Sequence, residues 1–196
     1  PHVIIESNGF KIEDRFINEL KTKFKDISIS KTYSGEGIVV SNQNAKGIII
    51  KGVDNSNSEG LEILKKNIKN GSVAEFQKKT VFIGAELAFD LNLKVGDKIN
   101  LMSSAFVATP FGGLPKQESL TIVGVFNTGF YEFDHNYVFL NLPDALSLFD
   151  KEIYEQNLEI YLNNPMKADD FKNKIQNLNP NFFVYSWSDL NKSFFS

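Results

Sequence analysis

The sequence predicts an α+β fold in which a β-rich part is inserted between the two halves of a split βαβ unit. Two observations support this class. Both ends of the chain read as strand, helix, strand, and the middle is dominated by short apolar strands separated by turn residues. Strands that flank a helix in this way usually lie in one sheet, joined by a right-handed crossover. We expect one part from residues 1–57 and 155–196, and an inserted part from residues 58–154.

The N-terminal half of the split unit is defined by an amphipathic helix between Ile12 and Phe24. Apolar residues recur there at helical spacing, with acidic residues toward the start and lysines toward the end, which suits the helix dipole. This half continues into apolar runs that are broken by glycines and a polar turn. The strands predicted here are residues 2–6, 27–33, 37–41 and 47–53.

The polar stretch Asp54–Gly60 is the best candidate for a boundary between the parts. Its spaced oxygen ligands resemble a calcium loop, but the twelve-residue pattern needs glycine at Glu59 and a carboxylate at Lys65. A turn that caps the following helix is therefore favoured. That helix runs through Leu61 and ends near Gly71.

The inserted part contains short helices, and the C-terminal half repeats the strand–helix–strand pattern. Helices are expected at residues 86–91 and from Pro143, because proline favours the first turn of a helix. The C-terminal helix spans residues 165–178. The remaining strands are predicted at residues 80–84, 98–102, 119–126, 136–140, 158–162 and 182–187.

The most unusual stretch of the insert is Ser103–Glu118, which joins two clear strands. Loops without secondary structure rarely exceed about 12–15 residues unless they are functional or disordered. This one carries several apolar side chains, two prolines that stiffen it and a Gly112-Gly113 pair that permits a tight reversal. It is predicted to be a long protruding hairpin loop. Either it grips another protein, or its apolar residues fold back over the core of the domain.

Composition excludes several classes of protein. The formal net charge of −3 argues against general nucleic-acid binding, and Arg15 is the only arginine, which weakens any bidentate phosphate clamp. Absence of cysteine excludes disulfides and thiolate metal sites, and no apolar run reaches the ~18 residues of a transmembrane helix. The chain opens directly in a strand and ends in a helical pattern, so we expect an excised domain.

Few residues suggest catalysis. The densest polar cluster, Tyr131–His135, would place Glu132 and Asp134 on one face of a strand, but solvated acids explain it better than a carboxylate pair or metal site. Gly35 and Gly37 lack the third glycine of a dinucleotide motif, and neither a Walker loop nor a G-x-S-x-G elbow occurs. We expect no enzyme activity, no metal and no cofactor.

Three segments in this order carry a family resemblance: IGAELAFDLNLKVGDKINLM, a loop with TPFGGLP, and LTIVGVFNTGFYEFDHNYVFLNLPDALSLF. Together they resemble the periplasmic domain of LolC/LolE-type permeases, the membrane subunits of the ABC transporter that releases lipoproteins from the bacterial inner membrane. The likeness extends through most of the chain to YSWSDLNKSFF, which is similar to the approach to a transmembrane helix. The first segment is shared with the wider MacB-like group, and the TPFGGLP loop is more specific.

The resemblance implies a porter-like α/β subdomain with the inserted β-rich part, and a hook that engages the soluble carrier LolA. The hook maps onto Ser104–Pro115, with Thr109, Pro110 and Gly112 matching the motif. A surface beside its base would correspond to Asn100, Gln117 and Glu118. Only Gln117 matches there, because Asn100 and Glu118 stand where basic residues are expected; Lys98 or Lys116 could substitute. The implied hook contacts are Phe106, Val107, Ala108, Thr109, Pro110, Phe111, Gly112, Gly113, Leu114 and Pro115.

The resemblance also implies the setting of the domain. The segment would lie in the periplasm as part of an inner-membrane permease, with a second permease subunit, a separate cytoplasmic ATPase and a lipoprotein substrate. The long loop favours the LolC-like branch or a permease that does both jobs. The alternatives are a MacB- or FtsX-like domain that binds another periplasmic protein, and a small-ligand domain with a pocket between its two parts.

Overall fold

The computed structural model describes residues 1–56 and 58–192 and divides the chain into two compact units. The terminal unit comprises residues 1–32 and the segment from residue 152 onward, and the central unit comprises residues 33–151. The division expected from the sequence grouped residues 33–57 with the two ends of the chain. Contacts group them with the middle instead, because their strands pair with strands of the central unit.

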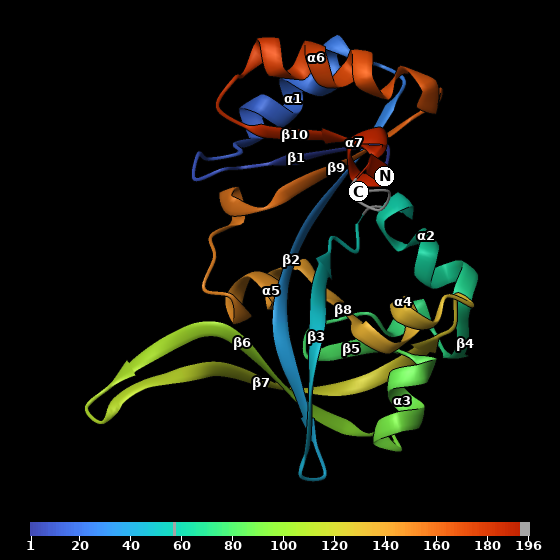
Figure 1. Cartoon of the computed structure of the whole chain (residues 1–196), viewed down its shortest axis with the longest axis vertical. Coiled ribbons are helices and arrows are strands. Elements are labelled where there is room, and N and C mark those ends of the chain that lie inside the picture. The colour runs from blue at the N-terminus through green and yellow to red at the C-terminus, as the bar shows by residue number, and fades with distance from the viewer. Residues whose placement is uncertain (57, 193–196) are drawn as a thin grey trace. The chain divides into compact units, whose positions relative to one another are not determined.

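The terminal unit has a four-stranded antiparallel arrangement covered by two helices (Figure 1). Its strand order is β10-β1-β9-β2, and each strand is antiparallel to its neighbours. Strands β1 and β2 are therefore parallel to each other, with β9 between them. This is the split βαβ arrangement expected from the sequence. Its elements are β1 (Val3–Glu6), α1 (Asp14–Lys23), the first half of β2 (Ile27–Ser41), η2 (Ile153–Glu155), β9 (Asn157–Leu162), η3 (Pro165–Lys167), α6 (Ala168–Leu178), β10 (Phe183–Ser186) and α7 (Trp187–Lys192).

The core of the terminal unit follows from the two amphipathic helices. Ile17 and Leu20 of α1 and Phe171 and Ile175 of α6 belong to one buried cluster with alternate residues of the strands. A strand places successive side chains on opposite faces, so Val3 and similar residues at alternate positions meet the helices. Apolar burial of this kind is the dominant stabilising term of the unit.

The central unit contains a mixed sheet with the strand order β3-β8-β5-β7-β4, in which β3 and β8, and also β5 and β7, are parallel. Strand β6 pairs with β7 and with residues 37–40 of β2. The elements are β3 (Asn44–Val53), α2 (Ser58–Asn67), β4 (Ile68–Gly71), η1 (Val73–Glu75), β5 (Thr80–Gly84), α3 (Ala85–Leu91), β6 (Lys98–Thr109), β7 (Gly112–Phe126), α4 (Tyr131–Asn136), β8 (Tyr137–Asn141) and α5 (Leu142–Leu148).

Strands β5 and β8 are buried on both faces, which explains their continuous apolar sequences. Phe82 and Phe139 face one core cluster, whereas Ile83 and Val138 face another. Since both faces of these strands are covered, the alternating pattern typical of a half-exposed strand is absent. The expected mixture of helices and sheet is confirmed.

Three local predictions were wrong. Residues 27–41 form one strand, because pairing with β9 and then with β6 continues past the glycines. Ile68 starts β4 rather than continuing the helix before it. The cluster Tyr131–His135 is helical, not extended. Its buried Asp134 accepts hydrogen bonds from the backbone N–H groups of Thr128 and Gly129 at 2.9–3.1 Å, which fixes the turn into α4.

The described part of the candidate boundary stretch contains a turn before α2. The Asp54 carboxylate accepts hydrogen bonds from the backbone N–H and hydroxyl of Ser56, at 2.9 and 2.7 Å. Such an Asx turn satisfies the carboxylate locally. Residue 57 of this stretch and residues 193–196 of the expected C-terminal helix lie outside the described residues.

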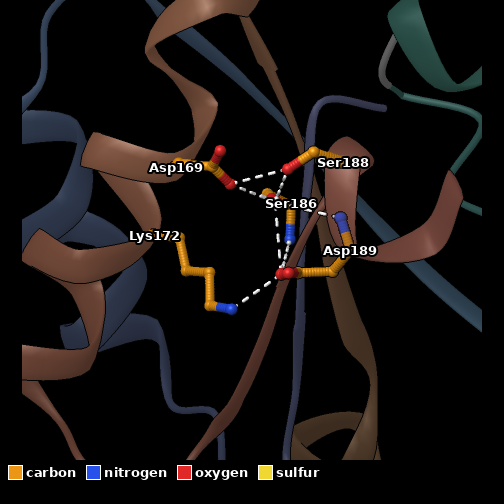
Figure 2. Close-up of polar contacts among 5 residues, drawn as sticks. All are labelled: Asp169, Lys172, Ser186, Ser188 and Asp189. Carbon is orange, nitrogen blue, oxygen red and sulfur yellow. Dashed lines mark hydrogen bonds and ion pairs between the residues drawn. The ribbon is translucent and has the colours of Figure 1, made fainter. Parts of the chain in front are cut away.

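A polar network joins α7 to α6 in the terminal unit (Figure 2). Asp189 accepts hydrogen bonds from the backbone N–H of Ser186 at 2.9 Å and from the Lys172 ammonium at 2.6 Å. Ser186, which is fully buried, and Ser188 donate their hydroxyls to Asp169 at 2.5 and 2.8 Å. The Lys172 hydrogen bond, with that from the Ser186 backbone, lowers the pKa of Asp189 to about 2. The network therefore caps α7 and fastens it to α6.

We expect Gly84→Ala to destabilise the central unit, because the new Cβ would lie 1.8 Å from the carbonyl oxygen of Asp134. Overpacking of this kind costs about 1–3 kcal/mol, which chemical denaturation of the variant would measure. The matched control is Gly47→Ala, whose added Cβ meets no atom within 4 Å. Equal stability of the two variants would contradict the close approach of α4 to β5.

The Asp189 carboxylate should make the stability depend on acid pH. Its folded pKa lies below its unfolded value, so its contribution is present in full above pH ~4 and is lost as the pH falls toward 2. With 27% of the side chain exposed, we expect about 1–2 kcal/mol after allowance for screening. In denaturation curves recorded from pH 2 to 7, Asp189→Asn should be less stable at pH 7 and show a flatter acid slope. The exposed Asp26→Asn serves as the control and should keep the wild-type slope.

Candidate functional site: the β6–β7 hairpin

The stretch expected as an irregular loop is a long β-hairpin. Pairing between β6 and β7 runs from Lys98↔Thr121 to Thr109↔Gly112, with one irregularity between Met102 and Phe106. The loop prediction for residues 103–118 was therefore wrong, although the expected protrusion is visible (Figure 1). Backbone hydrogen bonds between the two strands hold the chain extended where sequence patterning alone did not indicate a strand.

The chain reverses at Pro110-Phe111, not at the Gly112-Gly113 pair. Proline fits the second position of a tight turn and glycine the fourth, which is the arrangement here. Gly112 adopts a left-handed conformation with φ of +114°, which glycine tolerates without steric cost. The Thr109 hydroxyl donates to the Gly112 carbonyl at 2.5 Å and accepts from the Phe111 N–H at 3.3 Å. These bonds leave the turn little freedom.

The base of the hairpin is fastened to the C-terminal end of α5. The Ser103 hydroxyl donates to the Leu148 carbonyl, and the Lys116 ammonium donates to the Ser147 carbonyl at 2.7 Å. Lys116 also lies 3.6 Å from the Asp150 carboxylate. The last carbonyls of a helix have no partner within the helix, and its C-terminus favours cations. The hairpin base thus supplies the groups that this helix end needs.

We call residues Phe106–Leu114 the hairpin tip. Its apolar side chains stand in solvent: Phe111 is 100% exposed, Phe106 66%, Leu114 59% and Val107 46%. The interpretation in which these residues fold back over the core of the domain is therefore wrong. Single exposed apolar residues are normal, but a contiguous group of them indicates an interaction surface.

The tip is apolar on both faces. Phe106 pairs with Pro115 on one face, and Val107 pairs with Leu114 on the other. Ala108, Gly113, Thr109 and Gly112 form the last two pairs before the turn. A hairpin packed on its own sheet would need only one apolar face. Apolar residues on both faces and at the turn fit insertion into a concave apolar surface.

The three residues expected beside the base do not form one surface. Asn100 and Gln117 are exposed on the same face of the sheet, because they pair with Ser119 and Met102 respectively. Glu118 pairs with Leu101 on the opposite face and forms an ion pair with Lys79. Lys116, considered as a substitute for the missing basic residues, is held at the end of α5. Lys98 is exposed at the far end of β6.

The structure adds two apolar residues to the face that carries Asn100 and Gln117. Ile38 of β2 pairs with Met102 of β6, which in turn pairs with Gln117 of β7. Ile38 is exposed and Met102 half-buried. No local pattern indicated this row, because the pairing of β2 with β6 joins segments that are distant along the chain. Only hydrophobic alternation within residues 37–41 could have indicated that Ile38 faces outward.

The polar residues around α4 contact one another and neighbouring elements. The His135 ring contacts the Asp90 carboxylate of α3, and the Lys46 ammonium donates to the His135 carbonyl and to the Asn136 side chain, both at 2.8 Å. Burial lowers the pKa of Lys46. Among the described residues, no group of three or more histidine, cysteine or acidic side chains is placed to hold a metal ion.

Sequence comparison relates the chain to LolC proteins, although no family model matches it. The lipoprotein-releasing system transmembrane protein LolC of Buchnera aphidicola subsp. Acyrthosiphon pisum is 26% identical over 196 residues, 96% of this chain and 47% of that protein. LolC of Neisseria meningitidis serogroup B is 32% identical over 90 residues, 45% of this chain and 21% of that protein. LolC of Xylella fastidiosa is 26% identical over 98 residues, 49% of this chain and 24% of that protein. The chain spans less than half the length of these relatives.

Solved structures share the fold at low sequence identity. The periplasmic region of MacB from Actinobacillus actinomycetemcomitans has a TM-score of 0.61 and 12% identity, covering 98% of this chain and 91% of that one. The extracellular domain of YknZ, an ABC-type transporter from Gram-positive bacteria, has a TM-score of 0.61 and 11% identity, covering 94% and 99%. Among the described residues, no helix has the length and apolar character to cross a membrane. The resemblance predicted from the sequence is confirmed: this chain is similar to LolC in sequence and to the periplasmic domains of MacB-like ABC permeases in fold.

Proposed function

We propose that the chain is the periplasmic domain of the permease subunit of a lipoprotein-releasing ABC transporter in the bacterial inner membrane, and that its hairpin tip docks a LolA-like soluble lipoprotein carrier. The observation that carries the proposal is the fully exposed Phe111 at the end of a hairpin that is apolar on both faces. The likeness to LolC supports the lipoprotein-releasing system as its setting.

The physical advantage of a paired hairpin is that it is ordered before the partner arrives. Association costs conformational entropy wherever a loop must be fixed, so a tip held by strand pairing and by the Thr109 hydrogen bonds loses little. Aromatic side chains in a desolvated pocket usually dominate binding energy. Phe111 and Phe106 are the anchors, and Val107 and Leu114 fill the pocket around them.

The acyl chains of the lipoprotein explain why a docking element is needed. Acyl chains contribute about 0.8 kcal/mol per buried CH₂, so an acylated lipoprotein does not cross an aqueous compartment unprotected. The carrier must therefore be held at the exit until it is loaded. ATP hydrolysis takes place on a separate cytoplasmic subunit, and a second permease subunit completes the transporter, so this domain contributes binding and not catalysis.

The surface beside the base contributes neutral contacts to this docking. Asn100 and Gln117 offer amide groups, and the Ile38–Met102 row adds apolar area on the same face. The charged Glu118 and Lys116 are already paired with Lys79 and Asp150. A contact without exposed ion pairs is only weakly screened by salt.

The alternative is a related domain with another partner. The domains of MacB and YknZ share the fold of this chain, and a fold alone does not determine function. In that case the hairpin tip would still insert into a periplasmic protein, but not into a lipoprotein carrier. Identification of the protein that co-purifies with the chain separates the two functions.

Deletion of Phe106–Leu114, with Ala105 joined to Pro115 through an Asn-Gly turn, should abolish carrier binding without unfolding the domain. The shortened hairpin keeps the pairs between residues 100–102 and 117–119 and its contacts with α5. A pull-down with the LolA-like carrier tests binding, and thermal unfolding tests the fold. Carrier recovered by the folded deletion variant would rule out the tip as the docking element.

Phe111→Asp should weaken carrier binding by about 2 kcal/mol or more, which is roughly a 30-fold rise in Kd, because it puts a charge into the apolar contact. Isothermal titration with the carrier measures the change. Phe130→Asp is the matched control, since Phe130 is 75% exposed but lies outside the hairpin. An equal loss in both variants would point to a general effect of charge instead of an anchor at the tip.

A further inference from the structure

A cavity of about 530 Å³ lies in the central unit, away from the hairpin tip in sequence and lined by other elements. Its walls are α3, the loop that follows it, the edge strand β4 and the end of β7. Pockets that hold small molecules usually measure about 300–1,000 Å³. The volume therefore suits a small organic ligand.

The apolar lining of this cavity continues the hydrophobic core. Ala88 and Val125 are buried members of the core cluster, and Leu93 packs against it. Phe89 forms part of the wall yet remains 83% exposed, on a helix in which Leu87, Ala88 and Leu91 are buried. Covering a phenyl ring from water is favourable because it removes apolar area from contact with the solvent. A ligand with an apolar body would cover this ring.

The charged side chains that line the cavity are positive. Lys69 and Lys94 line the cavity, and no carboxylate does so among the described residues. Asn70 and Asn127 also line it; the side-chain oxygen of Asn127 accepts the Gly129 N–H at 3.0 Å, which leaves its amide group to donate. The chain as a whole carries a net charge of −3, so this local excess of positive charge opposes the overall sign.

Both lysines stand on segments that hydrogen bonds hold in place. Lys69 lies in β4 at a register irregularity, between Ile68 and Asn70, which pair with Phe126 and Val125 of β7. Lys94 follows the end of α3, where the Leu93 N–H donates to the Ala88 carbonyl at 2.8 Å. The Lys94 N–H donates to the Asp97 carboxylate at 3.0 Å. The backbone that carries both lysines is therefore held by these hydrogen bonds, which lowers the entropy cost of binding.

We propose that this cavity binds a small amphipathic anion, a free molecule with an alkyl or aryl body and one carboxylate, sulfonate or phosphate group. The body lies against Phe89, Ala88 and Val125, and the anionic group meets the ammonium groups of Lys69 and Lys94 and the amide of Asn127. The proposal is independent of carrier docking, because it uses none of the residues of the hairpin tip.

Protection of an exposed sheet edge accounts for only part of this arrangement. Lysine on an edge strand discourages pairing with another chain, and Lys69 on β4 fits that role. Lys94 lies on a loop, so it does not protect a sheet edge. An exposed Phe89 would promote association with other apolar surfaces, not prevent it. A binding site explains all three residues at once.

Titration of the 196-residue chain with three probes tests the proposal, with amide chemical shifts and isothermal titration as the readouts. Decanoate carries both features, decyltrimethylammonium keeps the alkyl body but reverses the charge, and acetate keeps the charge without the body. Decanoate should bind at least about tenfold more tightly than either of the others. Its largest shifts should fall on Ala88, Leu93, Val95 and Val125.

Variants separate the two halves of the site. Lys69→Gln combined with Lys94→Gln should weaken decanoate binding about tenfold. The control pair Lys78→Gln and Lys151→Gln removes the same charge from exposed positions outside the cavity. This control should leave the affinity for decanoate unchanged. Phe89→Ala should weaken it severalfold, and Phe111→Asp should have no effect.

Several outcomes would overturn the proposal. These are equal affinity for decanoate and decyltrimethylammonium, shifts centred on the hairpin tip, and unchanged binding in the Lys69/Lys94 double variant. A chain that binds the carrier but fails these tests would refute the cavity alone. A chain that binds decanoate as expected but not the carrier would refute only the docking function.

Discussion

The structure depends on the pairing of β6 with β7 beyond the edge of the central sheet. An isolated hairpin is marginally stable in water, so an extension of this kind needs support at its base. That support comes from α5, whose last carbonyls accept hydrogen bonds from Ser103 and Lys116. The hairpin donors satisfy carbonyl groups at the end of this helix, and the tip extends from the base with its apolar side chains exposed.

Strand β7 serves three surfaces along its length. Its first residues, including Leu114, form the hairpin tip, and Gln117 lies on the sheet face beside the base. Near its end, Val125 contributes to the core and to the floor of the cavity under α3. The two proposed binding surfaces differ in chemistry. The tip presents apolar side chains without charge, whereas the cavity combines apolar lining with two ammonium groups.

The fold of this chain is more widely shared than its sequence. Structures of MacB and YknZ domains share the architecture at 11–12% identity, which shows how little sequence this fold requires. Likeness to LolC extends over 96% of the chain in one relative but reaches only 26% identity there. Fold alone does not determine a partner, so the proposed docking function rests on the exposed apolar residues of the hairpin tip, which include Phe106, Phe111 and Leu114.

Local sequence determined most of the elements because their signals are local. Helical spacing identified α1 and α6, the proline at Pro143 marked the start of α5, and the apolar runs identified β5 and β8. Proline, glycine and the apolar residues of the TPFGGLP segment also indicated that residues 103–118 form a special protrusion. These properties depend on side chains a few positions apart, which a single sequence displays directly.

Tertiary structure decided what depends on contacts between distant segments. Strand pairing turned the loop into a hairpin, placed the reversal at Pro110-Phe111 and separated Glu118 from Gln117 on opposite faces. Hydrogen bonds to Asp134 fixed the turn into α4 where extended structure was expected. The cavity beside α3 could not be predicted from the sequence either, because its lining comes from β4, α3 and β7. Register and cavities arise from long-range packing, and no local pattern encodes which segment a strand will meet.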